Sequence, residues 1–185
     1  MNKLYIKISK FLSFILRHGP NKVGLELDSN GFADLNAVLK VLNHRFKNFK
    51  VTRHTIEEII EQSEKKRFQI ENSKIRAFYG HSIDDKIIMK LAVDLPPILF
   101  HGTNLRAYNA IKTEGLIKKK RQYVHLSDNM ETAILVGKRT SSKPIIVKID
   151  AKSAQNGGVK FYKSGDMYLA DYIPPKFIKK VNSEK

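Results

Sequence analysis

Hydrophobic residues at helical spacing dominate the first part of the chain. In residues 11–16, FLSFIL, the apolar side chains form one face of a predicted helix. This helix is expected to end at the neighbouring Arg17 and His18. A second apolar face follows Asp34, a suitable N-cap, and a third helix is expected to start near Thr52.

Two segments of this first part alternate between apolar and polar residues instead. In VGLELDSNGF, the alternation predicts a short strand at residues 25–27 and a turn at residues 28–31. RFQIENSKIRAF alternates on both sides of a polar turn at residues 71–74, which is typical of a β-hairpin. Helices followed by a two-stranded hairpin indicate a winged-helix-like lobe in residues 1–95.

The pattern then changes to short apolar or alternating runs that predict strands. Pro96 and Pro97 exclude a helix at this boundary. The predicted strands lie in ILFHGT, QYVHLS, PIIVKID, GGVKFY and MYLADYIP. One helix is expected at residues 106–113, ending before Gly115, and residues 179–185 are expected to be frayed.

The length and the charge of the chain indicate its domain organisation and the class of its partner. At 185 residues the chain can hold one large core or two small ones, so we predict an α+β protein with a second, compact domain in residues 96–185. Lys and Arg total 34 against 18 Asp and Glu, which gives a net charge of +16 and indicates a nucleic-acid partner.

Composition also limits the other function classes. The longest apolar runs are only a few residues, too short for a membrane span. The start, MNKLYIKISK, lacks the apolar core of a signal peptide, and no cysteine is present to form disulfides or thiolate metal sites. The absence of cysteine fits a reducing cytoplasm, so we expect a cytoplasmic protein. We also expect it to be a monomer.

Four segments place histidine or arginine beside an apolar strand or helix end: LRHGP, IRAFYGHS, LFHGT and KKKRQYVHLS. Strand alternation separates Arg76 from Ile75 and Ala77, so Arg76 can point at a ligand. In QYVHLS, the same period places His125 and Ser127 on one face, where they can share a pocket wall.

Each of these segments also has a structural interpretation. Arg17 and His18 can cap the C-terminus of a helix. The basic run at residues 118–121 can be a solvated loop, and His101 in LFHGT can be a hydrogen-bonded strand end. The histidines do not lie at the spacing of helical metal ligands, so no metal site is expected.

Taken together and in this order, the segments resemble the NAD-dependent RNA 2′-phosphotransferase family. The similar segments are ISKFLSFILRHGP, VGLELDSNGF, IRAFYGHS, LFHGT, YVHLS and MYLADYIPPKFI, and they extend over residues 8–178. The resemblance implies that residues 1–95 form an RNA-binding lobe. It implies that residues 96–185 form an ADP-ribosyltransferase-like domain that binds NAD.

The resemblance further implies a two-step reaction in which NAD is a co-substrate. An internal RNA 2′-phosphate, such as one left at a tRNA splice junction, attacks the ribose carbon that bears nicotinamide. The ribose 2″-hydroxyl of this ADP-ribosylated intermediate then attacks the phosphorus. The products are RNA with a 2′-hydroxyl, ADP-ribose 1″,2″-cyclic phosphate and nicotinamide.

The family's catalytic tetrad falls on Arg17, His18, Arg76 and Arg121 of this sequence. Guanidinium groups suit a 2′-phosphomonoester, because each can bind two phosphate oxygens. His18 would give a proton to the departing ribose oxygen or orient the phosphate, and both roles are open. Tyr79 departs from the family pattern, because glutamine is expected before GHS.

For the cofactor, the resemblance assigns His101, Gly102 and Thr103 to the first ADP-ribosyltransferase motif and His125 and Ser127 to the second. The third element, MYLADYIP, has no glutamate where protein-modifying relatives carry a catalytic one. A phosphate acceptor is already anionic and needs no general base.

Two other functions fit parts of the sequence. A winged-helix nucleic-acid-binding protein without catalysis would account for the charge, but not for LFHGT and YVHLS. An enzyme that stops after the first step would ADP-ribosylate the phosphate ends of nucleic acids.

Overall fold

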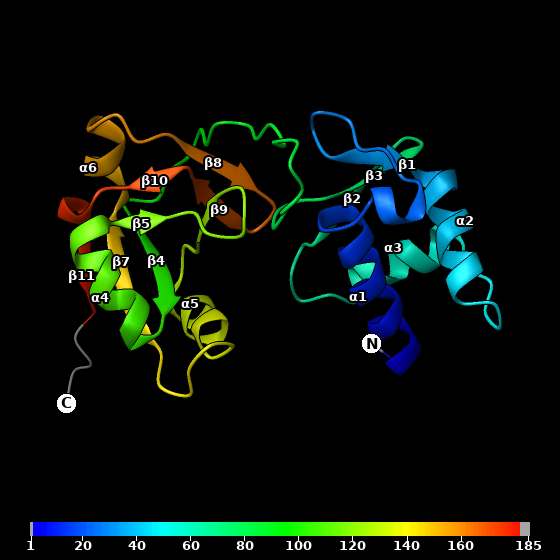
Figure 1. The fold of residues 1–185 in the computed structure, drawn as a ribbon, viewed down its shortest axis with the longest axis horizontal. Coiled ribbons are helices and arrows are strands. Elements are labelled where there is room, and N and C mark those ends of the chain that lie inside the picture. The colour runs from blue at the N-terminus through cyan, green and yellow to red at the C-terminus, as the bar shows by residue number, and fades with distance from the viewer. Residues whose placement is uncertain (1, 182–185) are drawn as a thin grey trace. The chain divides into compact units, whose positions relative to one another are not determined.

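The computed structural model describes residues 2–181. The chain divides into two compact units, Met1–Ile88 and Met89–Lys185, which we call unit 1 and unit 2 (Figure 1). Both units mix helices with small antiparallel sheets. Within residues 2–181, none of the helices is long and apolar enough to cross a bilayer.

Unit 1 combines helices with an antiparallel sheet of strand order β1-β3-β2. Its elements are α1 (Lys3–Arg17), η1 (Asn21–Val23), β1 (Phe32–Asp34), α2 (Leu35–Arg45), α3 (Arg53–Glu61), β2 (Phe68–Glu71) and β3 (Lys74–Ala77). The predicted helices and the predicted hairpin are confirmed. The hairpin turn is closed by Asn72 in the left-handed region, with φ 53°.

Polar caps start the helices of unit 1 at the expected positions. The Asp34 carboxylate accepts a hydrogen bond from the Ala37 N–H at the start of α2. Thr52 forms a reciprocal capping box with Thr55 at the start of α3. The apolar faces behind these caps then pack into one core with α1 and β3.

One strand predicted in unit 1, at residues 25–27, is wrong. The chain there leaves a 3-10 turn, η1 (Asn21–Val23), through Gly24 in the left-handed region, with φ +69°. The next turn is held by the Asp28 carboxylate, which accepts a hydrogen bond from the Phe32 N–H at 3.0 Å. The strand therefore starts after the turn, as β1.

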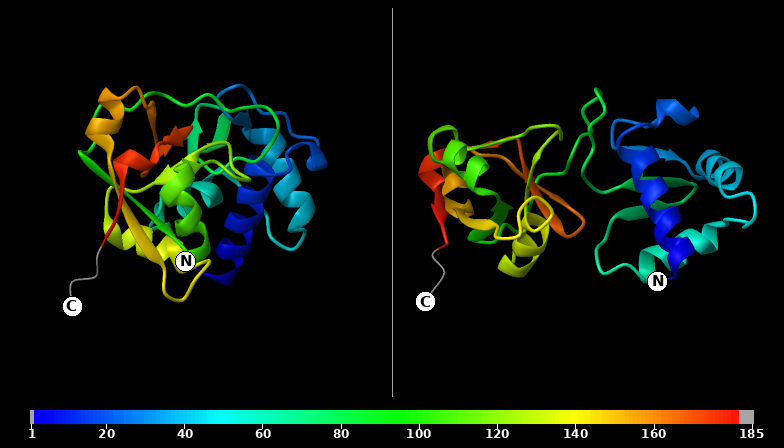
Figure 2. Two further views of the ribbon diagram at one scale, coloured as in Figure 1. Left: turned by 60° about the vertical axis from the view of Figure 1, so that its left-hand side comes forward. Right: turned by 60° about the horizontal axis from the view of Figure 1, so that its bottom comes forward.

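Unit 2 contains the antiparallel sheets β11-β7-β4 and β6-β9-β8 and the short pair β10-β5 (Figure 2). The strands are β4 (Ile98–Thr103), β5 (Leu116–Ile117), β6 (Val124–Leu126), β7 (Ile145–Asp150), β8 (Phe161–Ser164), β9 (Met167–Ala170), β10 (Tyr172–Ile173) and β11 (Ile178–Lys180). The helices are α4 (Leu105–Glu114), α5 (Met130–Gly137), α6 (Ala151–Asn156) and the 3-10 turn η2 (Pro175–Phe177).

The two larger sheets of unit 2 are joined where β4 passes β6. The Phe100 N–H donates to the Ser127 carbonyl at 2.8 Å, and the Ser127 N–H donates to the Phe100 carbonyl at 3.0 Å. This bridge fixes the register of the two strands. It brings His101, the next residue of β4, close to His125 of β6.

Most of the expected elements of unit 2 are confirmed, including α4 and its terminal Gly115 at φ +80°. Two helices, α5 and α6, were not predicted. The predicted fraying at residues 179–185 is wrong at its start, because β11 pairs with β7. Residues 182–185 lie outside the described part of the chain.

The boundary between the units lies earlier than the two prolines suggest. The Ala92 N–H donates to the Phe161 carbonyl at 2.9 Å, and the Lys163 N–H donates to the Lys90 carbonyl at 3.1 Å. These bonds attach the segment before Pro96 to β8 and therefore to unit 2. The predicted division of roles between the units remains a prediction.

Candidate active site

The C-terminus of α1 positions Arg17 and His18 in unit 1. His18 is the C-cap residue of α1, and its backbone N–H donates to the Phe14 carbonyl, while the expected capping by the side chains of Arg17 and His18 remains a prediction. The imidazole is also engaged, because His18 Nδ1 lies 2.8 Å from Ser82 Oγ. The Ser82 N–H donates to the Arg17 carbonyl at 2.9 Å, so the segment after β3 crosses the end of α1.

The Arg17 guanidinium packs between two aromatic rings of unit 1. Its Cζ lies 5.9 Å from the centroid of Phe68 and 5.3 Å from the centroid of Tyr79. Both distances are within the range of cation–π attraction. Tyr79, the departure from the expected glutamine, therefore has a local role here: its ring supports the position of Arg17.

Arg76 lies on the face of the hairpin opposite Ile75 and Ala77, as strand alternation predicted. Arg76 Nε donates to Gln69 Oε1 across the strand pair at 2.8 Å, and the guanidinium lies 4.5 Å from the centroid of Phe32. Burial lowers the pKa of Arg76 from its ordinary value, but an arginine side chain stays protonated in proteins.

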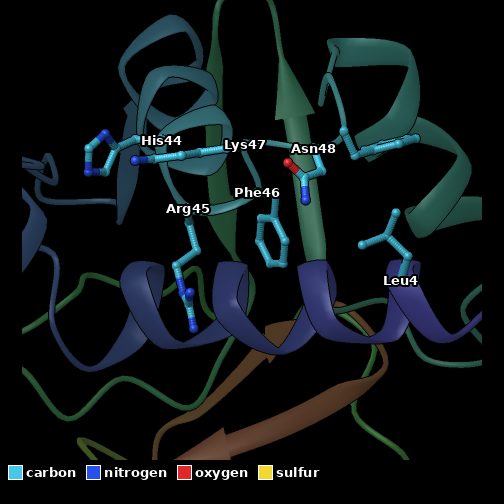
Figure 3. A pocket seen from close by; sticks show the side chains of 7 residues that line it. Leu4, His44, Arg45, Phe46, Lys47 and Asn48 are labelled. Atoms are coloured by element: carbon cyan, nitrogen blue, oxygen red, sulfur yellow. The ribbon is translucent and has the colours of Figure 1, made fainter.

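A cavity of about 700 Å³ in unit 1 contains none of the predicted site residues. It is lined by Leu4, His44, Arg45, Phe46, Lys47, Asn48 and Phe49. Figure 3 shows Arg45 and Phe46 extending toward α1. The Phe46 ring packs against Phe11, with centroids 6.0 Å apart, so this aromatic residue holds the loop onto α1.

In unit 2, a cavity of about 630 Å³ gathers most of the predicted cofactor residues. Its walls come from the end of β4, from α4, from the loop between β5 and β6, from β6 and from the end of α5. The predicted residues that line it are His101, Gly102, Thr103, Arg121 and His125. Two stretches of the sequence, residues 101–125 and 136–140, thus meet at one cavity.

His101 is held in its neutral form. Burial lowers the pKa of His101, the His125 carbonyl partly offsets this, and the charge of Lys119 lowers the pKa further. His101 Nδ1 lies 2.9 Å from the His125 carbonyl oxygen. Because a carbonyl only accepts, Nδ1 carries the hydrogen and Nε2 is left as an acceptor for a ligand hydroxyl.

The lowered pKa of His101 predicts a loss of stability in acid. The unfolded chain binds a proton at His101 more readily than the folded chain does. The contribution of neutral His101 to the free energy of unfolding is therefore complete above about pH 6.5, and it is lost as pH falls through the lowered pKa. Denaturant unfolding from about pH 7.5 to about pH 5 would measure it. We expect the free energy of unfolding to decline more steeply with falling pH in the wild type than in His101→Gln. Parallel curves for the two proteins would contradict the lowered pKa of His101.

Gly102 is required by packing in this cavity wall. A Cβ on Gly102 would lie 2.0 Å from the Ala133 carbonyl oxygen and 3.0 Å from the Gly137 nitrogen, so only glycine lets α5 approach β4 this closely. The expected role of Gly102 in binding the cofactor remains a prediction. Thr103, the next residue, is buried.

Ser127 lies outside the cavity lining. Its hydroxyl donates to the Asn129 carbonyl at 2.8 Å, just before α5, and its side chain is 2% exposed. In the structure Ser127 therefore fixes the turn between β6 and α5. Its predicted contact with a cofactor remains a prediction.

Several cations line the same cavity. Burial lowers the pKa of Arg121, and the charge of the nearby Arg139 lowers it further. Lys118 and Lys119 line the cavity as well. These four cations outnumber Glu114, the one carboxylate among the described residues of the lining, so the cavity favours an anionic ligand. Sequence reasoning missed Arg139, because it lies in a loop without a recognisable motif.

Comparison with known proteins identifies the family. Residues 3–170 match the family described as "RNA 2'-phosphotransferase, Tpt1 / KptA family". The chain belongs to this family. A protein of Acetivibrio thermocellus named "Probable RNA 2'-phosphotransferase" is 46% identical over 95% of this chain and 96% of its own length. One from Archaeoglobus fulgidus, named "Probable RNA 2'-phosphotransferase 2", is 39% identical over 94% of this chain and 79% of its own length.

The two units of this phosphotransferase thus present different chemistry. In unit 1, Arg17 and Arg76 are each supported by aromatic rings, and the orientation of the His18 ring is fixed by Ser82. In unit 2, a neutral histidine and a group of cations line a cavity of about 630 Å³. Among residues 2–181, no group of three or more His, Asp or Glu side chains is arranged to hold a metal ion.

Proposed function

We propose that this phosphotransferase transfers an internal RNA 2′-phosphate to NAD as co-substrate. The products would be RNA with a 2′-hydroxyl, ADP-ribose 1″,2″-cyclic phosphate and nicotinamide. Family membership supports the phosphate transfer from RNA. The observation that carries the NAD part is the cavity of unit 2, where His101 and His125 share a wall with Arg121 and Arg139.

In this proposal the two units have different partners. Unit 1, with its helices and the hairpin β2–β3, would be the winged-helix-like RNA lobe. Unit 2 would be the ADP-ribosyltransferase-like domain. A net charge of +16 suits binding to the RNA backbone, which is largely electrostatic and independent of sequence.

The cavity of unit 2 suits a dinucleotide in size and chemistry. Its volume of about 630 Å³ lies within the usual range of small-molecule sites, about 300–1,000 Å³. Lys119 and Arg139 would pair with the pyrophosphate. The Nε2 acceptor of His101 would bind a ribose hydroxyl.

The first step would join the RNA to ADP-ribose. A 2′-phosphate oxygen bonds to the ribose carbon that carries nicotinamide, and the bond from that carbon to the nicotinamide nitrogen breaks. The electron pair leaves with the nitrogen, so nicotinamide departs as a neutral molecule. Guanidinium groups of Arg17, Arg76 and Arg121 would hold the other phosphate oxygens and aim the attacking one.

The second step would release the repaired RNA. The ribose 2″-hydroxyl attacks the phosphorus and loses its proton, while the RNA 2′-oxygen leaves and gains one. The arginines would stabilise charge on the equatorial phosphoryl oxygens. His18, whose ring is oriented by Ser82, would give the proton to the 2′-oxygen or orient the phosphate.

One incubation tests the proposal. A short RNA with an internal 2′-phosphate is mixed with the purified chain, with and without NAD, and the products are separated and weighed by mass spectrometry. We expect loss of the phosphate and formation of the cyclic phosphate only with NAD. RNA that keeps its phosphate in the presence of NAD would refute the proposal. RNA that gains ADP-ribose and retains it would show that the reaction stops after the first step.

A further inference from the structure

The outer face of α1 carries a stripe of side chains that the core does not use. The buried face of this helix is formed by residues such as Leu12 and Ile15, both 0% exposed. On the opposite side, Ile6, Lys10, Phe14 and His18 follow each other at intervals of four residues, so they form one line along the helix. This line ends at the candidate catalytic histidine.

A pocket of about 300 Å³ lies along this stripe, within unit 1. Lys10, Phe14 and His18 line it together with Ile6, the two serines at positions 9 and 13, and Arg67. None of these lining residues is acidic. The serines are small, so they leave room between the larger side chains of the stripe.

The Phe14 ring is fixed in place but remains accessible. Its centroid lies 6.4 Å from that of His18, and the Lys22 ammonium lies 5.9 Å from the Phe14 ring. A Cβ on Gly19 would lie only 3.0 Å from Phe14 Cζ, so the ring packs closely against the Gly19 backbone. Phe14 nevertheless stays 38% exposed, and within residues 2–181 it is the only phenylalanine among the exposed large hydrophobic residues.

We infer that Phe14 is a stacking platform for the base of the nucleotide next to the 2′-phosphorylated one. An accessible aromatic ring flanked by cations fits a nucleotide, because the base can stack on the ring while lysine or arginine neutralises its phosphate. Lys10 and Arg67 line the same pocket and can take that phosphate. This inference rests on the proposed function, because the 2′-phosphate is taken to lie at His18.

The other aromatic residues of unit 1 explain why Phe14 is singled out. Phe46 and Phe49, which line the larger cavity, pack against Phe11 and Tyr5 of α1, at centroid distances of 6.0 and 6.4 Å. Their rings hold a loop onto the helix. Phe14 differs because the pocket that it lines is also lined by His18.

A binding experiment without NAD tests this platform. Dissociation constants are measured for a trinucleotide with an internal 2′-phosphate and for two versions that lack the base on the 5′ or the 3′ side. We expect one of the two abasic versions to bind the wild type at least about fivefold more weakly, the lower end for a single base–aromatic stack. Equal affinity for all three RNAs would overturn the inference.

Variants identify the residue that is responsible. We expect Phe14→Leu to bind the intact trinucleotide more weakly than the wild type does, by the factor that removal of the base causes in the wild type. On the abasic RNA that the wild type binds weakly, Phe14→Leu should show no further loss of affinity. Phe14→Tyr should keep the affinity of the wild type. Phe46→Leu is the matched control and should preserve the base dependence. Equal losses of Phe14→Leu on intact and abasic RNA would refute the platform, even if thermal unfolding shows that this variant is less stable.

Failure of this inference can be told apart from failure of the proposed function. If the RNAs lose their 2′-phosphate with NAD but bind without any dependence on the neighbouring base, only the platform is refuted. If the base dependence is present but no phosphate is transferred, the proposed reaction is refuted.

Discussion

Replacing Arg121 with alanine is expected to slow turnover by about 100- to 1,000-fold, while RNA affinity changes by no more than a few fold. The guanidinium lines the cavity of unit 2 beside Arg139, and burial lowers its pKa without removing its charge. A fixed donor of this kind acts mainly on charge that develops in the transition state. RNA affinity depends instead on the total charge of the surface.

The adjacent Lys120 supplies a matched control for this prediction. It is exposed and is absent from the cavity lining, so Lys120→Ala removes the same charge from the same loop. Single-turnover rates with saturating NAD, and RNA dissociation constants at one fixed salt concentration, separate the two effects. If Arg121→Ala and Lys120→Ala reduce turnover equally, Arg121 has no specific role. If Arg121→Ala lowers the single-turnover rate and the RNA affinity by the same factor, Arg121 serves only in RNA binding.

Replacing Gly102 with alanine is expected to destabilise unit 2 and abolish NAD use together. The new methyl group would lie 2.0 Å from the Ala133 carbonyl oxygen, which belongs to the α5 backbone and cannot rotate away. The helix would have to move, and overpacking of this kind costs about 1–3 kcal/mol or more. Hydrogen exchange of the β4 and β7 amides would report the loss of stability.

Gly158→Ala is the control within the same unit. Gly158 has φ +90° with nothing within 4 Å of a built Cβ, so the substitution strains only the backbone, at a cost of about 1 kcal/mol. It should leave NAD use intact, because Gly158 does not line the cavity. If Gly102→Ala were no more destabilising than Gly158→Ala, the tight contact between β4 and α5 would not exist in solution.

The sequence predicted those elements whose signals are local and strong. The helix starts at Asp34 and Thr52 are marked by side chains that satisfy backbone N–H groups, and the hairpin is marked by alternation on both sides of Asn72. The strand expected at residues 25–27 was wrong because two alternating leucines are too few to outweigh the turns on either side.

The two unpredicted helices lack a clear helical period, although each begins at a polar N-cap. METAILVG, the sequence of α5, is apolar on nearly every side, so helical periodicity is absent and the run resembles a buried strand. Its real start signal is Asn129, whose side chain accepts a hydrogen bond from the Thr132 N–H. Helix α6 has only six residues, too few for a period to emerge.

Residues of the candidate site could be predicted where they lie in motifs that resemble those of a known family. They could not be predicted where they depend on contacts between residues that are far apart in the sequence. Resemblance found His101 and His125, and the structure adds that a hydrogen bond connects them through Nδ1 and a carbonyl. Neither Arg139 at the cavity nor the support that Tyr79 gives to Arg17 could be read from spacing. Both depend on residues that are distant in sequence.

The attachment of residues 90–92 to β8 has a practical consequence for anyone who separates the two halves of this chain. A fragment cut at the proline pair would lose the backbone partners of Phe161 and Lys163 and leave an open sheet edge. Open edges invite aggregation. A soluble C-terminal piece should therefore begin at Met89, where the compact unit itself begins.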